Sequence, residues 1–108
     1  MSDQGKPALE VIQGQIKELD AIFKQASEDL NTVAASERVA KWKLRTIAVV
    51  AEHLSREDVK RFAETQPGPS FTNDFLEELS DEIEVYRNCL VSIAAKVKKQ
   101  QEANPGPP

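Results

Sequence analysis

The sequence contains few of the residues that build reactive or metal-binding sites. Its 108 residues include one cysteine, Cys89, and one histidine, His53. A structural zinc site needs about four ligands, and one cysteine cannot form a disulfide within the chain. A Cys–His nucleophile pair would need the fold to join the two residues, but a cysteine beside an apolar helix stripe usually packs as a small hydrophobe. We therefore expect no catalytic residue, metal or cofactor, and no enzymatic activity.

Long apolar runs and phosphate-binding loops are also missing. No run approaches the ~20 residues that cross a bilayer, and the N-terminal "MSDQGKP" does not resemble a signal peptide. The Glu-x-x-His pairs of di-iron helical bundles are absent, because the lone histidine is preceded directly by Glu52. Together with the single cysteine, these features predict a cytoplasmic protein with no membrane contact and no small-molecule substrate.

Charge is unevenly distributed along the chain. The formal net charge of −4 disfavours nucleic acid as the main partner, since phosphate binding depends on a basic surface. Residues 36–61 carry seven basic and four acidic side chains, whereas residues 64–84 carry seven acids and no base. The two regions could pack against each other inside the fold, or they could present two faces to other molecules.

The hydrophobic pattern is helical over most of the chain. Pro7 suits the first turn of a helix. From Leu9, apolar residues recur at steps of three and four, which predicts one face of an α-helix that faces a core. Self-pairing as a coiled coil is the alternative. The stripe comprises Leu9, Ile12, Ile16, Leu19, Phe23, Ala26, Leu30 and Val33.

A second helix is expected from about Glu37 to Leu54, with Ser36 as its N-cap. Apolar residues, Leu44 among them, cover more than half of its circumference, so it should contact at least two neighbours as the central helix. Lys43 falls inside this apolar arc beside Trp42. It should either extend its ammonium group to solvent or meet an acid across a helix contact.

Two further helices follow. Ser55 should cap a short third helix that ends near Thr65 or Gln66, because Pro67 and Pro69 disfavour helical geometry before them. The Pro67-Gly68-Pro69 corner is interpreted mainly as a rigid connection, with a binding loop as the alternative.

The fourth and longest helix is expected from about Asn73 to Gln101. Thr72 should be its N-cap, and Phe71 should pack on Leu76 as a hydrophobic staple. Its apolar stripe comprises Leu76, Leu79, Ile83, Tyr86, Leu90, Ile93 and Val97.

These patterns predict an all-α fold: a small helical bundle of three long helices plus one short helix. Residues 7–102 would form a single domain, with flexible tails at 1–6 and 103–108. Because the two middle helices are shorter than the outer ones, we expect uncovered apolar surface around Leu90 and Ile93. This surface predicts a homodimer.

Candidate partner surfaces come from the charged segments. The basic one would offer Trp42 for stacking on bases. The acidic run is most simply a solvated helix face, with a partner surface as the alternative. The candidate residues are Arg38, Lys41, Trp42, Lys43, Arg45, Glu77, Glu78, Asp81 and Glu82.

The segments "WKLRTIAVVAEHL" and "EVYRNCLVSIAAKV", with Phe62 between them, resemble small helical domains of uncharacterised bacterial proteins. Some of those domains precede effector modules of defence or conflict systems. The resemblance covers about residues 36–97 and implies no catalytic residue. The sequence thus favours a non-enzymatic protein-interaction or regulatory module, and the resemblance implies a bacterial source. The alternative is a small helical subunit that contacts RNA or DNA within a larger assembly, through the basic edge of the second helix.

Overall fold

The computed structural model describes residues 5–69 and 73–103, and all regular structure in these ranges is helical. The four helices are α1 (Gly5–Asp29), α2 (Thr32–Val50), α3 (Arg56–Glu64) and α4 (Phe75–Ala103). The predicted all-α bundle of three long helices and one short helix is confirmed.

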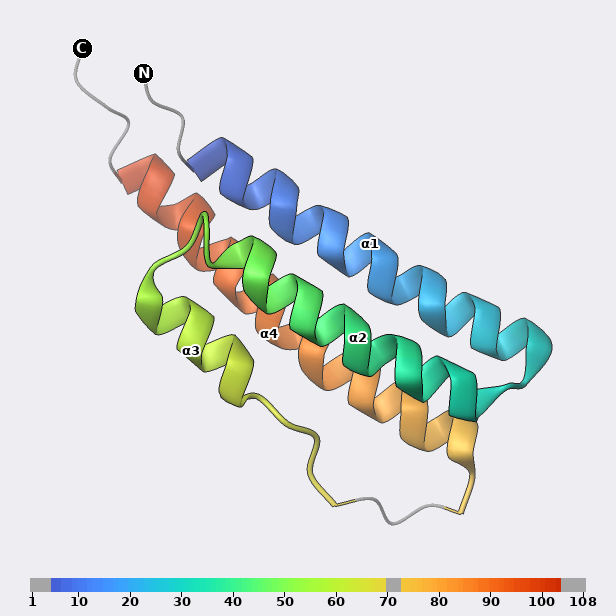
Figure 1. Cartoon of the computed structure of the whole chain (residues 1–108). Coiled ribbons are helices and arrows are strands. Elements are labelled where there is room, and N and C mark those ends of the chain that lie inside the picture. The colour runs from blue at the N-terminus through green and yellow to red at the C-terminus, as the bar shows by residue number, and fades with distance from the viewer. Residues whose placement is uncertain (1–4, 70–72, 104–108) are drawn as a thin grey trace.

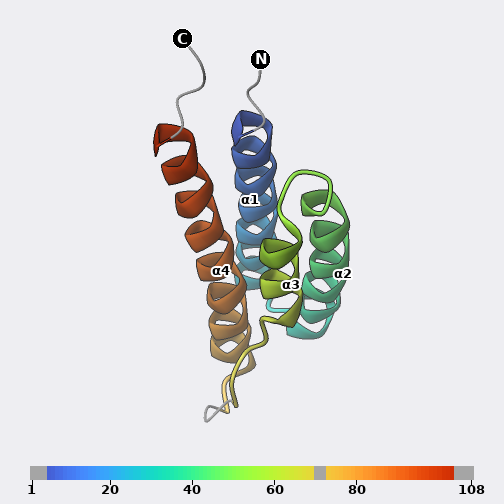
Figure 2. The same ribbon diagram turned by 90° about the vertical axis from the view of Figure 1, so that its left-hand side faces the viewer.

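The three long helices lie side by side: α1 runs antiparallel to both α2 and α4, which run parallel to each other (Figure 1). The start of α1 and the end of α4 lie at the same end of the molecule. α1 packs most extensively, first on α4 and then on α2, whereas α2 and α4 meet over a much smaller area. α2 contacts all three other helices, so the prediction that it packs on at least two neighbours is confirmed. It is not uniquely central, because α4 also contacts all three other helices and α1 packs on both α4 and α2 (Figure 2).

The first turn lies earlier in the chain than the sequence pattern indicated. α1 ends at Asp29, and Leu30 adopts a left-handed backbone conformation with φ 56°. Its N–H donates to the carbonyl of Ala26 at 2.8 Å, which closes the helix as a left-handed C-cap. The side chain of Asn31, not of Ser36, then caps α2 by accepting from the N–H of Ala34 at 3.1 Å. The apolar stripe predicted for α1 therefore ends before Leu30.

The short third helix matches its predicted limits. α2 ends at Val50, four residues before the expected boundary, and a turn leads to Ser55. The Ser55 hydroxyl accepts from the N–H of Asp58 at 3.2 Å, so the predicted N-cap is confirmed. At the other end, Thr65 is the extended C-cap residue, two positions before Pro67.

The start of α4 is capped by Asp74. Its carboxylate accepts from the N–H groups of Leu76 at 2.9 Å and Glu77 at 3.3 Å, which gives donors of the first turn a partner. The predicted cap at Thr72 and the predicted staple partner Phe71 lie outside the described residues. Leu76 itself is half-buried against the core.

The core follows the predicted stripes of α1 and α4, and three aromatic rings from three helices meet in it. Trp42 on α2, Phe62 on α3 and Tyr86 on α4 have ring centroids 5.8 to 6.2 Å apart in edge-on or tilted arrangements. Such arrangements are favoured by the quadrupoles of aromatic rings. The other buried apolar residues are Ala8, Ile12, Leu19, Ala26, Ala35, Val39, Val50, Leu79, Ile83, Cys89, Leu90, Ile93 and Val97.

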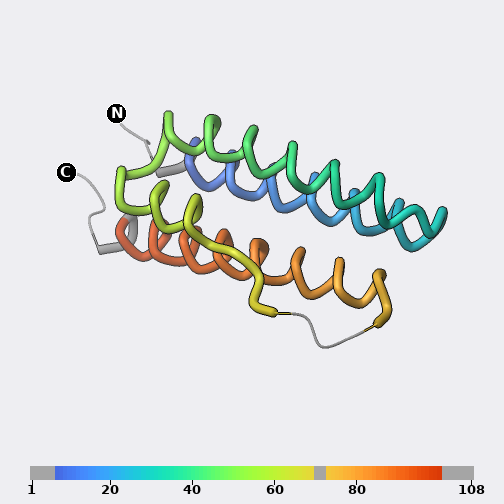
Figure 3. Tube along the Cα trace, turned by 60° about the horizontal axis from the view of Figure 1, so that its bottom comes forward, coloured from blue at the N-terminus to red at the C-terminus, as the bar shows by residue number. Residues whose placement is uncertain are grey.

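Helix α3 lies over the groove between α2 and α4 and covers only the second half of α4 (Figure 3). Lys96 pairs with the buried Asp58 at 2.9 Å, and Arg61 donates to the Ser92 hydroxyl at 3.0 Å. At 1.5 Å per residue, the 19 residues of α2 span about 28 Å and the nine of α3 only about 13 Å. About half of the groove along α2 thus extends beyond the end of α3.

This placement corrects the predicted self-association surface. Leu90 and Ile93 are completely buried within the single chain. They lie on the stretch of α4 between Cys89 and Lys96, which is contacted by Asp58 of α3 and by Thr65, the C-cap residue of α3. The predicted exposure assumed that α3 was too short to cover this stretch, but α3 is aligned with it. The uncovered apolar surface lies at the opposite end of the bundle, near the start of α4.

Candidate protein-docking groove

Part of the basic edge predicted on α2 is buried or already paired with other residues of the chain. Trp42 is completely buried, and its indole N–H donates to the backbone carbonyl of Gln15 on α1 at 2.9 Å. Its ring therefore cannot stack on a nucleobase, and its place in the list of surface residues is corrected. Arg45 pairs with Glu18 at 3.1 Å, which ties α2 to α1.

The remaining basic side chains of α2 differ from one another. Lys41 is exposed and Arg38 is half-buried. Lys43 turns inward: its ammonium donates to the backbone carbonyl of Thr65 at 2.7 Å and lies 4.7 Å from the centre of the Tyr86 ring. A cation is favoured both at a helix C-terminus and over an aromatic face. Lys43 thus links the end of α3 to α2 and α4 through its hydrogen bond to Thr65 and its contact with Tyr86.

The residues considered for catalysis and metal binding lie in different environments. Cys89 is buried on α4 and accepts from the Thr65 hydroxyl at 3.4 Å, whereas His53 is exposed in the turn after α2. No hydrogen bond joins them within the described residues. In residues 5–69 and 73–103, no three His, Cys, Asp or Glu side chains gather closely enough to hold a metal ion. No helix in these ranges is both long and apolar enough to cross a membrane.

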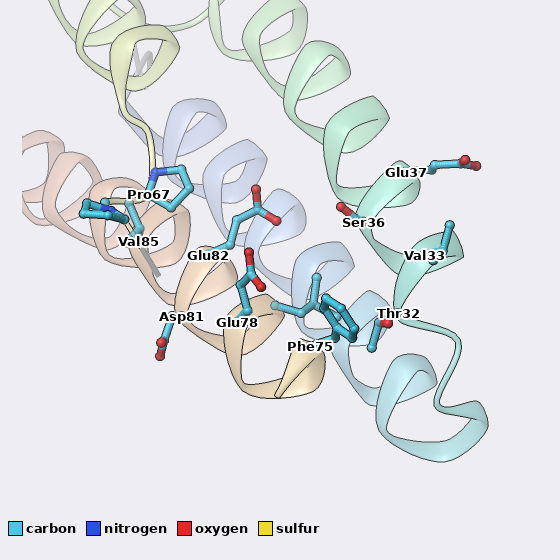
Figure 4. A pocket seen from close by; sticks show the side chains of 13 residues that line it. Thr32, Val33, Ser36, Glu37, Pro67, Phe75, Glu78, Asp81, Glu82 and Val85 are labelled. Carbon is cyan, nitrogen blue, oxygen red and sulfur yellow. The ribbon is translucent and has the colours of Figure 1, made fainter. Parts of the chain in front are cut away.

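A groove occupies the end of the bundle that α3 leaves uncovered. Its walls are the first turns of α2, residues 67–69 and the stretch of α4 from Phe75 to Val85. Its volume of about 570 Å³ is in the range of sites that bind ligands or peptide side chains. Figure 4 shows the two helices facing each other across this space, with Phe75 beside Thr32.

Both buried and exposed apolar side chains line the groove. Leu79 is buried at its base, and Val85 is half-buried. Phe75 is 71% exposed and Val33 is 72% exposed, although both are large apolar residues. Exposed apolar residues that line one concave surface are typical of interaction sites.

Carboxylates surround the apolar floor. Among the described residues that line the groove, four are acidic and none is basic: Glu37, Glu78, Asp81 and Glu82. Glu78 and Glu82 lie one turn apart on the same side of α4 (Figure 4). Burial, and to a smaller extent repulsion from Glu78, raises the pKa of Glu82 above its ordinary value of 4.5, while Lys43 opposes this rise. Burial and the Glu82 charge likewise raise the pKa of Tyr86. The groove therefore concentrates negative charge in a partly desolvated place.

The predicted acidic surface coincides with this groove in part. Glu78, Asp81 and Glu82 line it, but Glu77 does not. Sequence reasoning missed Glu37, Val33 and Phe75 as members of one site, because only the tertiary structure brings the starts of α2 and α4 together. Residues 67–69, interpreted mainly as a connection, also form a wall of the groove.

Comparison with models of known protein families, with curated proteins and with solved structures finds no match for this chain. The resemblance to bacterial helical domains therefore stays a prediction.

Proposed function

We propose that this chain is a non-enzymatic protein-interaction module and that the groove between α2 and α4 is its docking site. The observation that carries the proposal is that the short helix α3 covers only part of the groove between α2 and α4. α3 fills one half of the α2–α4 groove, and the other half is open, with Phe75 and Val33 exposed beside it. A helical segment of a partner protein would continue where α3 ends.

The expected geometry of docking follows from the lengths of the helices. About 15 Å of α2 remains beyond the roughly 13 Å that α3 covers, which corresponds to about ten residues of a partner helix. Helix-in-groove recognition uses apolar anchors at positions i, i+3, i+4 and i+7. Two or three such anchors fit a groove of this length.

Site-specific photo-crosslinking in host cells tests the proposal. A benzophenone amino acid is placed at Phe75 or, as the matched control, at Leu44, which is equally exposed at 71% but lies outside the groove. We expect one protein partner to crosslink from position 75 and not from position 44. The crosslinked partner segment should carry apolar residues at helical spacing. Equal crosslinking from both positions would mean only general apolar contact, and the proposed docking site would be wrong.

The nucleic-acid alternative remains a prediction, but the described fold leaves it fewer side chains. Trp42 is buried, Lys43 donates to Thr65 and Arg45 pairs with Glu18. Binding of RNA or DNA at physiological salt that is lost on charge reversal of Arg38, Lys41 and Arg45 would support it. The homodimer, the cytoplasmic location and the bacterial source also stay predictions, and a dimer would have to use a surface other than Leu90 and Ile93.

A further inference from the structure

We infer that the segment bound by the groove is a basic amphipathic helix of a partner protein, an inference that depends on the proposed docking function. Its apolar face would lie on Leu79, Phe75 and Val33, and its lysine or arginine side chains would meet the carboxylates at the rim. The charge of the groove, rather than its volume, identifies this class of partner.

The first observation is that, among the described residues, the acids that line the groove form no ion pair. The bundle pairs its acids elsewhere: Arg45 with Glu18, Arg87 with Asp20, and Lys96 with Asp58. Within the described residues, no ion pair engages Glu37, Glu78, Asp81 or Glu82. The charge of Lys43 partly offsets the rise in the pKa of Glu82, but the Lys43 ammonium donates its hydrogen bond to the Thr65 carbonyl. The rim therefore has excess negative charge for an incoming cation.

The second observation is that these acids flank apolar surface rather than a polar one. Glu78 and Glu82 alternate along α4 with Phe75, Leu79 and Val85. An acidic or neutral helix could use the same apolar floor, but it would place like charges together or leave the partly desolvated Glu82 without a counter-ion. Such repulsive elements exclude wrong partners as effectively as attractive contacts select the right one.

Three synthetic peptides of about 14 residues test the inference, with binding followed by ¹⁵N NMR titration and calorimetry. The first is an amphipathic leucine/lysine helix. The second has glutamate in place of every lysine, and the third is a scrambled leucine/lysine sequence with no apolar face. We expect only the first to shift the amide signals at the starts of α2 and α4. Its affinity should fall as salt is raised from 50 to 300 mM, because exposed ion pairs are screened.

Matched variants of the protein show whether peptide binding depends on the residues that line the groove. Glu78→Gln with Glu82→Gln should weaken binding of the first peptide roughly threefold to tenfold, as two partly exposed ion pairs are lost. The control, Glu10→Gln with Glu52→Gln, makes the same change in net charge at two exposed acids outside the groove, and it should leave the affinity unchanged. Phe75→Ser should weaken binding and Leu44→Ser should not.

Other outcomes overturn the inference in distinguishable ways. Equal binding of the glutamate peptide would show that charge does not select the partner, and the docking function would survive. Equal binding of the scrambled peptide would show only non-specific attraction. If sedimentation shows a dimer that Phe75→Ser dissociates, a second copy of this chain fills the groove instead. Absence of binding by all three peptides, with a partner still crosslinked from position 75, would refute a basic helix and retain the docking site. Absence of both signals would refute the docking function as well.

Discussion

The two halves of the α2–α4 groove are built from the same pair of helices, yet only one half belongs to the core. Where α3 covers it, Trp42, Phe62 and Tyr86 pack together, and the buried Asp58 is paired with Lys96. Beyond the end of α3, Phe75 and Val33 remain exposed. The difference does not come from the hydrophobicity of α2 or α4, since both halves contain large apolar residues. It depends on a covering helix of only nine residues.

The largest expected effect on stability comes from a substitution that removes packing in the half of the groove covered by α3. Trp42→Ala deletes the indole that contacts both other rings, and it also removes the hydrogen bond to the Gln15 carbonyl. We expect a loss of roughly 3–5 kcal/mol in the free energy of unfolding, a large share of the total stability of a small domain. Urea denaturation followed by circular dichroism measures it. Leu44→Ala, at an exposed site on the same helix, should change stability by less than about 0.5 kcal/mol. A similar loss from both variants would mean that the two sites are not packed as described.

A smaller effect is expected where the two halves meet. Lys43→Met keeps a side chain of similar length but removes the ammonium group. The hydrogen bond to the Thr65 carbonyl and the cation contact with the Tyr86 ring are therefore lost. We expect a loss of about 1–2 kcal/mol in stability. Hydrogen exchange should also accelerate at the Thr65 amide, which donates to the Phe62 carbonyl, more than at the centre of α1. Lys41→Met, at an exposed lysine of the same helix, should have almost no effect. Uniform acceleration along the chain would show that Lys43 has no local role at the end of α3.

The smallest effect concerns charge in the open half. Because the pKa of Glu82 is raised in the folded protein, ionisation of this carboxyl destabilises the fold. The folded state holds the proton more tightly than the unfolded state, so this contribution to stability is present at acidic pH. It is lost as pH rises from the unfolded pKa through the higher folded pKa. Glu82→Gln should therefore resemble the parent protein at acidic pH and be slightly more stable at neutral pH.

Denaturation between pH 3 and 8 measures this difference, with Glu84→Gln on the exposed side of α4 as the control. A Glu82→Gln variant that is less stable than the parent at neutral pH would indicate that the Glu82 carboxylate makes a favourable contact, contrary to the burial and the smaller repulsion from Glu78 that raise its pKa.

Local sequence signals were sufficient for much of the fold. The three- and four-residue steps of the stripes on α1 and α4 determined which faces are apolar, since a helix brings such residues to one side. Ser55 and Pro67 fixed the limits of α3, because capping and proline geometry act over only a few residues. Three acids of the candidate groove, Glu78, Asp81 and Glu82, belong to the acidic run that the sequence indicated, whose first interpretation was a solvated helix face and whose alternative was a partner surface.

The first turn shows where a local signal was misleading. Leu30 and Val33 continue the spacing of the α1 stripe, so periodicity alone extends the helix through them. In the structure Leu30 takes the left-handed conformation that glycine or asparagine usually adopts, and Asn31 begins α2. Asn31 was the signal that could have placed the cap correctly. Both apolar side chains, assigned to the core by the pattern, are exposed.

By itself, the sequence determined that the chain is helical, where the apolar faces lie and where α3 begins and ends, since these properties depend on neighbours within a few turns. Only the tertiary structure decided which helix covers which stretch of each face. The tertiary packing buries Leu90 and Ile93 and brings the Lys43 ammonium to the end of α3, and it leaves Phe75, Val33 and the acids around them open. Such contacts join residues far apart in the chain, and their alignment depends on the relative lengths and offsets of whole helices, which no local pattern records.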